Sequence, residues 1–170
     1  MSTPKPSIVR PAKLSDAEAI RTIYNYYVEK TIVTFETELV TTEQMRDRIR
    51  EVTSYSHWFV AESANGINGY AYACQWKSRC GFRFTLESTI YVSPHAVGIG
   101  IGRTLYAKLI STLRDTKFHA IVAGIALPNP ASIALHEKMG FEKVAHFPQV
   151  GWKFDKWIDV GYWQLILDKM

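Results

Sequence analysis

The sequence predicts an α+β fold in which helices flank a mixed, mainly antiparallel central sheet. Segments with apolar residues at helical spacing alternate with β-branched runs typical of strands, and three of these runs follow one another directly. The expected order is a strand, two helices, three strands, a helix, a strand, a helix and two strands. Because 170 residues is the length of one ordinary domain and no linker or repeat divides them, we expect residues 1–170 to form a single domain.

The first third of the chain is expected to hold one strand and two helices. A short apolar strand at 8–10 precedes Ser15-Asp16-Ala17-Glu18, which has the spacing of a helix capping box. The helix that follows should turn an apolar face toward the core, made of Ala19, Ile20, Ile23, Tyr24, Tyr27 and Val28. A second capping box at 41–44 predicts another helix through Ile49. The β-branched residues between the helices, 31–36, predict an extended loop.

The middle of the chain predicts an antiparallel meander. Strand-like runs cover residues 58–62, 67–76 and 84–92, and Asn65-Gly66 is a typical tight turn between the first two.

The last part of the chain predicts two helices and three strands. Apolar residues at Leu105, Leu109, Ile110 and Leu113 indicate a helix, and residues 120–126 a buried strand. A short helix should run over 130–139 and end at Gly140, the residue type that best adopts a left-handed conformation. Two strands, near 141–147 and 157–166, complete the sheet.

Composition and charge restrict the class of protein. With 47% hydrophobic and 21% charged residues and no segment of membrane-spanning length, the chain is typical of a soluble globular protein without a membrane partner. The polar segment 1–13 lacks the apolar stretch of a secretory signal, so we expect a cytoplasmic location. The net charge of +4 suits a nucleic acid or a small polyanion equally, but the basic residues are spread along the chain, which disfavours nucleic acid. Cys74 and Cys80 lack the spacing of a metal site or a disulfide framework.

A glycine-rich turn lies between the third strand of the meander and the next helix. Its core is Val97-Gly98-Ile99-Gly100-Ile101-Gly102-Arg103. Glycines let successive backbone N–H groups turn toward one point, and the positive end of the helix dipole behind them favours a pyrophosphate, as does the guanidinium of Arg103. The turn alone also fits a Rossmann loop or a flexible connection. Its place after a meander, with no opening βαβ unit, argues against the Rossmann fold.

At this turn the sequence resembles the GNAT superfamily of acetyltransferases. Their pyrophosphate loop has the form Q/R-x-x-G-x-G/A, which Gly100 and Gly102 match, whereas Val97 stands where the family usually has Gln or Arg. The resemblance implies a GNAT-like sheet, acetyl-CoA as co-substrate and no metal. Because backbone amides hold most of the pyrophosphate in this family, the departure at Val97 implies at most a lower affinity for the cofactor.

The resemblance narrows to the phosphinothricin and methionine sulfoximine N-acetyltransferases and extends over nearly the whole chain. The stretches that match in order are residues 23–28, 33–37, 87–92, 127–132, 151–153 and 157–164. Membership of this group implies a homodimer and transfer of acetyl to the α-amino group of a small amino-acid-like acceptor. A non-catalytic CoA-binding module is the alternative, motivated by Val97.

The resemblance implies the catalytic residues. Glu87 matches the family's general base, which would help to remove a proton from the acceptor's ammonium before it attacks the thioester. His136 stands where many GNAT enzymes have a tyrosine that protonates the departing thiolate, and imidazole titrates near neutrality. A backbone N–H near Tyr91 or Val92 would stabilise the oxyanion. From the residue types alone, a solvent-facing strand glutamate is the favoured interpretation of Glu87, and a surface histidine is as consistent with His136 as a catalytic one.

Further binding residues follow from the same resemblance. Besides the turn 97–103, the cofactor is expected to contact Ile90, Tyr91, Val92, Asn129 and Ser132. Asn129 is also a candidate helix N-cap. The acceptor, including its acidic part, is expected to contact Phe35, Glu36, Lys77, Arg79, Arg83 and Thr89.

Overall fold

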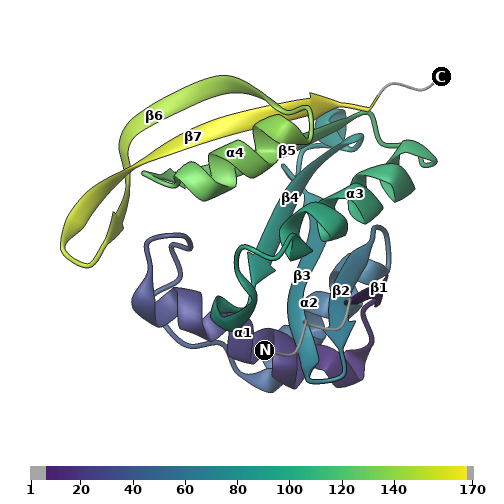
Figure 1. The fold of residues 1–170 in the computed structure, drawn as a ribbon. Helices are drawn as coiled ribbons and strands as arrows, with labels where there is room; N and C mark the ends of the chain where they lie inside the picture. The colour runs from purple at the N-terminus through teal and green to yellow at the C-terminus, as the bar shows by residue number, and fades with distance from the viewer. Residues whose placement is uncertain (1–6, 168–170) are drawn as a thin grey trace.

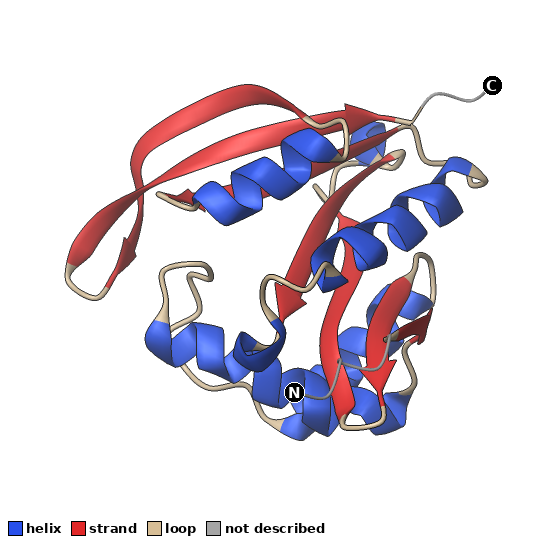
Figure 2. Ribbon diagram, viewed as in Figure 1, coloured by secondary structure: helices blue, strands red, loops and turns tan. Residues whose placement is uncertain are grey.

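The computed structural model describes residues 7–167, so the ends of the expected domain and of the polar N-terminal segment, 1–6 and 168–170, lie outside the described residues. One seven-stranded sheet runs through this range in the order β1-β2-β3-β4-β5-β7-β6 (Figure 2). Its strands are β1 Ile8–Pro11, β2 Trp58–Ser63, β3 Gly66–Gln75, β4 Thr85–Val92, β5 Ala120–Leu127, β6 Glu142–Lys153 and β7 Lys156–Ile166. The predicted fold class and element order are confirmed.

Two helices cover each face of the sheet. On one face α1 (Ala17–Lys30) and α2 (Thr42–Thr53) pack against β2, β3 and β4 through a core that includes Ile20, Ile49, Val60 and Tyr70. On the opposite face α3 (Ile101–Arg114) and α4 (Pro130–Lys138) close a second core around Leu105, Leu109, Ile121 and Trp163. Alternation along each strand sends successive side chains to these two cores. Within the described range, none of the helices has both the length and the apolar character needed to span a bilayer.

Among the described residues, β4 and β5 are the only parallel strand pair, and the sheet opens where these two strands separate. β4 and β5 pair over three positions, which end at Glu87 and Val122, although β4 continues to Val92 and β5 to Leu127. β3 stays paired with β4 to its end, and β7 stays paired with β5. Beyond Glu87 the sheet is therefore split between β4 and β5, and this split runs toward the glycine-rich turn that leads into α3 (Figure 1).

The predicted start of the first helix is wrong. Leu14–Asp16 forms a 3-10 turn, and Ser15 does not cap α1; Asp16 precedes the helix and makes no capping bond with its side chain. Asp16 instead accepts two hydrogen bonds from Arg10, at 2.7 and 2.9 Å. The local capping pattern is overridden because Asp16 pairs with Arg10 of β1, which also donates to Glu62 of β2 at 2.6 Å. The second capping box, Thr41 with Gln44, is confirmed.

The last strands differ from expectation in extent. β6 continues past 147 to Lys153, because irregular pairing between Phe147 and Gly151 lets the strand bend and carry on. Of the aromatic residues near the C-terminus, Trp157 is 60% exposed, whereas Trp163 is only 1% exposed and belongs to the core. Trp163 therefore adds nothing to an exposed aromatic surface. Gly140 has a φ of 91°, as predicted for the end of α4.

Candidate active site

Glu87 lies at the point where β4 and β5 separate. Its neighbours Leu86 and Ser88 point toward α3, so its own side chain lies on the opposite face of the sheet. Across the sheet it faces Gly124, at which an added Cβ would lie 3.5 Å from Oε1 of Glu87. The glycine therefore lets the carboxylate approach the backbone of β5 closely.

Two cavities meet at Glu87. The first has a volume of about 80 Å³ and occupies the split in the sheet, with lining residues from both faces that include Glu87, Ser88, Thr89, Ile90, Tyr91, Asn129, Ser132 and His136. The second has a volume of about 430 Å³ and lies under the β6–β7 hairpin, lined by Val33, Phe35, Glu87, Gly124, Ala126, Val150, Gly151, Trp152, Val160 and Tyr162. One carboxylate is thus in reach of molecules that enter from either side.

Burial sets the protonation behaviour of Glu87. Loss of solvent around the carboxylate raises its pKa above the ordinary value, and the ammonium of Lys77 opposes this effect only in part. A glutamate whose pKa is raised toward neutrality is a better proton acceptor than an exposed one. The environment of Glu87 is therefore suited to general-base chemistry.

His136 is buried, with an exposed fraction of 3%, and hydrogen bonds fix both ring nitrogens. Nδ1 lies 2.7 Å from the carbonyl oxygen of Ser132, which can only accept, so Nδ1 carries the proton. Nε2 lies 2.8 Å from the hydroxyl of Tyr106, which in turn lies 3.2 Å from the hydroxyl of Ser88. Burial lowers the pKa of His136, so the ring is neutral and Nε2 accepts from Tyr106.

The glycine-rich turn presents free backbone donors to the split. Gly98 and Gly100 have φ values of 84° and 88°, and no atom lies within 4 Å of a Cβ built at either residue. Gly100 caps α3 without a side-chain hydrogen bond, so the first amides of the helix keep their donors for a ligand. Ile101 is buried, while Val97, Ile99 and Arg103 are exposed. These features fit a pyrophosphate group.

Gly102 has a packing role that the loop pattern did not indicate. A Cβ at this position would lie 3.2 Å from Cδ2 of Leu135 and 3.6 Å from Cδ1 of Ile90. A larger residue at this position would therefore push α3 away from α4. Asn129 caps α4 by accepting from the amide of Ser132 at 3.1 Å.

The expected acceptor-binding residues divide into two sets. Phe35, Lys77 and Thr89 line cavities beside Glu87. Glu36 instead forms a two-pronged ion pair with Arg48, at 2.8 and 3.0 Å. Arg79 and Arg83 lie on the exposed segment between β3 and β4, and the guanidinium of Arg83 stacks on the ring of Phe84.

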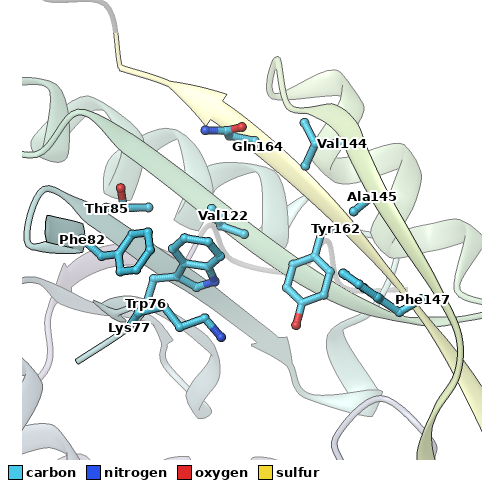
Figure 3. Close-up of a pocket in the computed structure, with 10 residues that line it drawn as sticks. All are labelled: Trp76, Lys77, Phe82, Thr85, Val122, Val144, Ala145, Phe147, Tyr162 and Gln164. Carbon is cyan, nitrogen blue, oxygen red and sulfur yellow. The ribbon is translucent and has the colours of Figure 1, made fainter. Parts of the chain in front are cut away.

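A third cavity continues the site away from the split. It has a volume of about 560 Å³ and is walled by Trp76, Lys77, Phe82, Thr85, Val122, Val144, Ala145, Phe147, Tyr162 and Gln164 (Figure 3). Tyr162 belongs both to this cavity and to the one under the hairpin, and the ammonium of Lys77 adds a cation to a wall of aromatic, aliphatic and uncharged polar side chains. An acceptor bound near Glu87 has room here for a side chain with an anionic end.

Sequence reasoning missed several residues of this site. Ser88, Tyr106 and Tyr162 line the cavities, and Tyr106 holds His136. Tyr106 stands within the apolar pattern of α3 and reads there as a core residue, so no local signal marked it. Among residues 7–167, no group of His, Cys, Asp and Glu side chains could hold a metal ion.

A split sheet beside uncapped helix amides, with a half-buried carboxylate between two cavities, defines a transferase that brings an anionic carrier and a second substrate together. The chain matches the acetyltransferase (GNAT) domain over residues 9–161. It is 38% identical over 160 residues to the phosphinothricin N-acetyltransferase of Streptomyces viridochromogenes, with 94% of this chain and 87% of that protein covered. The L-methionine sulfoximine/L-methionine sulfone acetyltransferase of Salmonella typhimurium is 39% identical, with 95% of each chain covered.

Solved structures agree with this assignment. The Salmonella typhimurium protein yncA, solved with its cofactor acetyl-CoA, has a TM-score of 0.93 at 38% identity, covering 98% of this chain and 96% of that one. A phosphinothricin acetyltransferase from Sinorhizobium meliloti, in complex with acetyl-CoA, has a TM-score of 0.93 at 32% identity, covering 97% and 90%. The chain belongs to the GNAT acetyltransferases and is an acyltransferase. The expected resemblance to the phosphinothricin and methionine sulfoximine group is confirmed.

Proposed function

We propose that this enzyme transfers the acetyl group of acetyl-CoA to the α-amino group of a small amino-acid-like acceptor by direct attack. The observation that carries the proposal is the position of Glu87, which lines both the split beside the glycine-rich turn and the cavity under the β6–β7 hairpin. The two substrates would enter from these two sides and meet at one carboxylate. No residue of the chain needs to be acetylated.

The residues of the split would bind the acetyl donor. The free amides that follow Gly100 would hold the pyrophosphate, and Ile90, Tyr91 and Val92 lie on the part of β4 that has no partner in β5. An extended arm laid in this split would replace the missing strand. A backbone N–H of Tyr91 or Val92 would donate to the thioester carbonyl as charge develops on its oxygen.

Glu87 would accept a proton from the incoming ammonium, so that the free amine can attack. The amine loses a second proton to solvent after the new C–N bond forms, and the sulfur gains one as the C–S bond breaks. We assign the donor to Tyr106: its hydroxyl, which donates its one proton to Nε2 of His136 at rest, would turn this proton to the sulfur and regain a proton from solvent once the products leave. Nε2 of His136 would hold the hydroxyl in place until then. Of the two, His136 is thus a positioning residue.

The shape of the site supports an amino-acid-like acceptor. The α-amine would lie at Glu87, while the cavity that contains Lys77 would take the side chain, with the ammonium near an acidic end group. Phosphinothricin, methionine sulfoximine and methionine sulfone, named for the relatives, are the first acceptors to test. Arg79 and Arg83 would add to the cationic approach to this cavity.

The defining experiment follows thiol release from acetyl-CoA across a panel of amino acids that includes these three compounds. Acetylation of at least one α-amine, confirmed by the mass of the product, is the expected result. A protein that binds acetyl-CoA but acetylates no amine would support the non-catalytic module instead, an interpretation that the presence of both Glu87 and His136 disfavours.

We also propose that the chain forms one acetyltransferase domain, that the enzyme is cytoplasmic, and that two copies form a homodimer. The exposed aromatic side chains of Phe147, Trp152 and Trp157 on the two strands at the edge of the sheet support the dimer, because apolar groups gathered at a sheet edge favour contact with a second copy.

A further inference from the structure

Lys153 is a buried lysine at the end of β6. Its exposed fraction is 2%, and its Nζ donates to the carbonyl oxygen of Thr34 at 2.7 Å and to that of Tyr27 at 3.5 Å. Within residues 7–167 no carboxylate lies within salt-bridge distance of this ammonium. Burying a lysine is costly unless its donors are satisfied, and here backbone carbonyls of a distant segment satisfy them.

The partner segment is the loop between α1 and α2, which forms one wall of the cavity beside Glu87. Figure 1 shows the tip of the β6–β7 hairpin next to this loop, although more than a hundred residues separate the two in the chain. The hydroxyl of Thr34 is also held, by the hydroxyl of Tyr24 at 2.8 Å, and it accepts from the amide of Glu36 at 3.3 Å. Thr34 is thus held by two hydrogen bonds, one from Lys153 to its carbonyl and one between its hydroxyl and Tyr24 of α1.

The ring of Phe35 completes the contact. A Cβ added to Gly151 would lie 2.1 Å from Cε1 and 2.4 Å from Cζ of Phe35, so the ring fills the place that a side chain at 151 would take. Phe35 and Gly151 both line the cavity beside Glu87. The wall of this cavity therefore consists of two segments that meet at one close ring-to-backbone contact.

Lys153 also contacts the turn of the β6–β7 hairpin. Phe154 and Asp155 form its turn with φ values of 52° and 57°, a left-handed conformation that non-glycine residues adopt at a cost. Lys153 immediately precedes them, and its ammonium lies 5.1 Å from the centre of the Phe154 ring. Contacts of Lys153 on both sides oppose the opening of the turn.

We propose that Lys153 is a positioning residue for the acceptor: by joining the hairpin tip to the loop that carries Phe35, it fixes the wall of the acceptor cavity. The expected effect on acceptor affinity rests on the proposed function, whereas the contact itself does not. The cofactor-binding turn and α3 lie on other elements, and among the described residues they make no hydrogen bond to Lys153 or Thr34.

The experiment compares Lys153→Met with Lys156→Met, which removes an exposed ammonium from the paired position across the same hairpin. Loss of the ammonium leaves the carbonyl of Thr34 buried and unpaired, so we expect the acceptor KM of Lys153→Met to rise by about tenfold while the affinity for acetyl-CoA stays unchanged. Lys156→Met should behave as wild type. A uniform loss of both affinities would indicate a merely structural role and overturn the proposal.

Hydrogen exchange followed by NMR tests the contact without any acceptor. In Lys153→Met the amide of Glu36, which depends on Thr34, should exchange faster, whereas the amide of Val40, held by the side chain of Asn25 at 3.0 Å, should not change. Unchanged exchange at Glu36 would overturn the proposal. If wild type acetylates no amine, the proposed function fails, and this measurement still decides whether Lys153 fixes the loop.

If Lys153→Met does not fold, Gly151→Ala tests the same wall of the acceptor cavity. The added methyl must displace the ring of Phe35 without touching the ammonium, so acceptor KM should rise and acetyl-CoA affinity should persist. An unchanged acceptor KM in a folded Gly151→Ala variant would show that the wall does not control acceptor binding, and would contradict the inference.

Discussion

The hydroxyl of Tyr106 lies 2.8 Å from Nε2 of His136, in a buried chain that begins at Ser88 on β4 and ends at the carbonyl of Ser132 on α4. Because the carbonyl fixes the proton on Nδ1, the direction of every bond in this chain is determined. The chain runs along the split in the sheet, and joins α3, α4 and β4 with polar side chains inside an otherwise apolar core.

Tyr106→Phe tests the proposed proton donor. The ring remains and only the hydroxyl is lost, so the fold and acetyl-CoA affinity should persist while kcat falls by roughly tenfold to a hundredfold. Tyr26→Phe, on the exposed side of α1, is the matched control and should have the kcat of wild type. Equal kcat values for the three proteins, measured by thiol release, would remove Tyr106 and His136 from the proton transfer.

Glu87→Gln tests the base. The amide keeps the shape but cannot accept the proton, so kcat/KM should fall by roughly a hundredfold or more, with little change in acetyl-CoA affinity. The loss should shrink as pH rises, because free amine then becomes available without the base. Steady-state kinetics at several pH values measure this. Wild-type activity of the variant at neutral pH would contradict the mechanism, and loss of cofactor binding would make Glu87 structural.

The raised pKa of Glu87 also predicts its effect on stability. A carboxyl whose pKa is higher in the folded than in the unfolded chain stabilises the fold below its unfolded pKa, and this contribution is lost as pH rises through the folded pKa. At neutral pH, Glu87→Gln should therefore be more stable than wild type, with a smaller difference in acid. Thermal unfolding at both pH values checks this, and a less stable variant at neutral pH would be the opposite result.

Gly100→Ala tests the cofactor turn, and Gly66→Ala is its control because both glycines have a positive φ. Gly100 and Gly66 both have positive φ, 88° and 107°, and space for a methyl group, but Gly66 lies in the β2–β3 turn. Alanine should strain both turns, yet only Gly100→Ala should weaken acetyl-CoA binding, by about tenfold or more. Calorimetric titration measures the affinity. Similar affinities in the two variants would place the pyrophosphate elsewhere.

Sedimentation at micromolar concentration tests the homodimer. We expect a species of twice the chain mass of 19.4 kDa, and a shift toward the monomer in Trp157→Glu, because this side chain is exposed at the sheet edge. Lys143→Glu, which changes an exposed charge on β6, is the control for altered charge alone. A wild-type protein that sediments only at 19.4 kDa would refute the dimer.

Much of the fold follows from local patterns. The meander, α3 and the Thr41–Gln44 cap were predictable because strand alternation, helical periodicity and capping are set by residues close together in the chain. The start of α1 was not, because the Arg10–Asp16 ion pair competes with the local cap at Ser15. β6 runs beyond the apparent end of its pattern because its last residues pair with β7 across the hairpin turn, from Gly151 with Ile158 to Lys153 with Lys156.

The sequence by itself determined the family and the glycine-rich turn and made Glu87 the candidate base, since these depend on residue types in a fixed order. Only the tertiary structure decided which side chains meet. Ser88, Tyr106 and His136 come from three elements, and Lys153 contacts Thr34 although 119 positions separate them in the chain. Their contacts arise because β4 and β5 part beyond Glu87 and the β6–β7 hairpin folds over the α1–α2 loop. Packing between distant elements sets such geometry, and no local pattern in the chain encodes it.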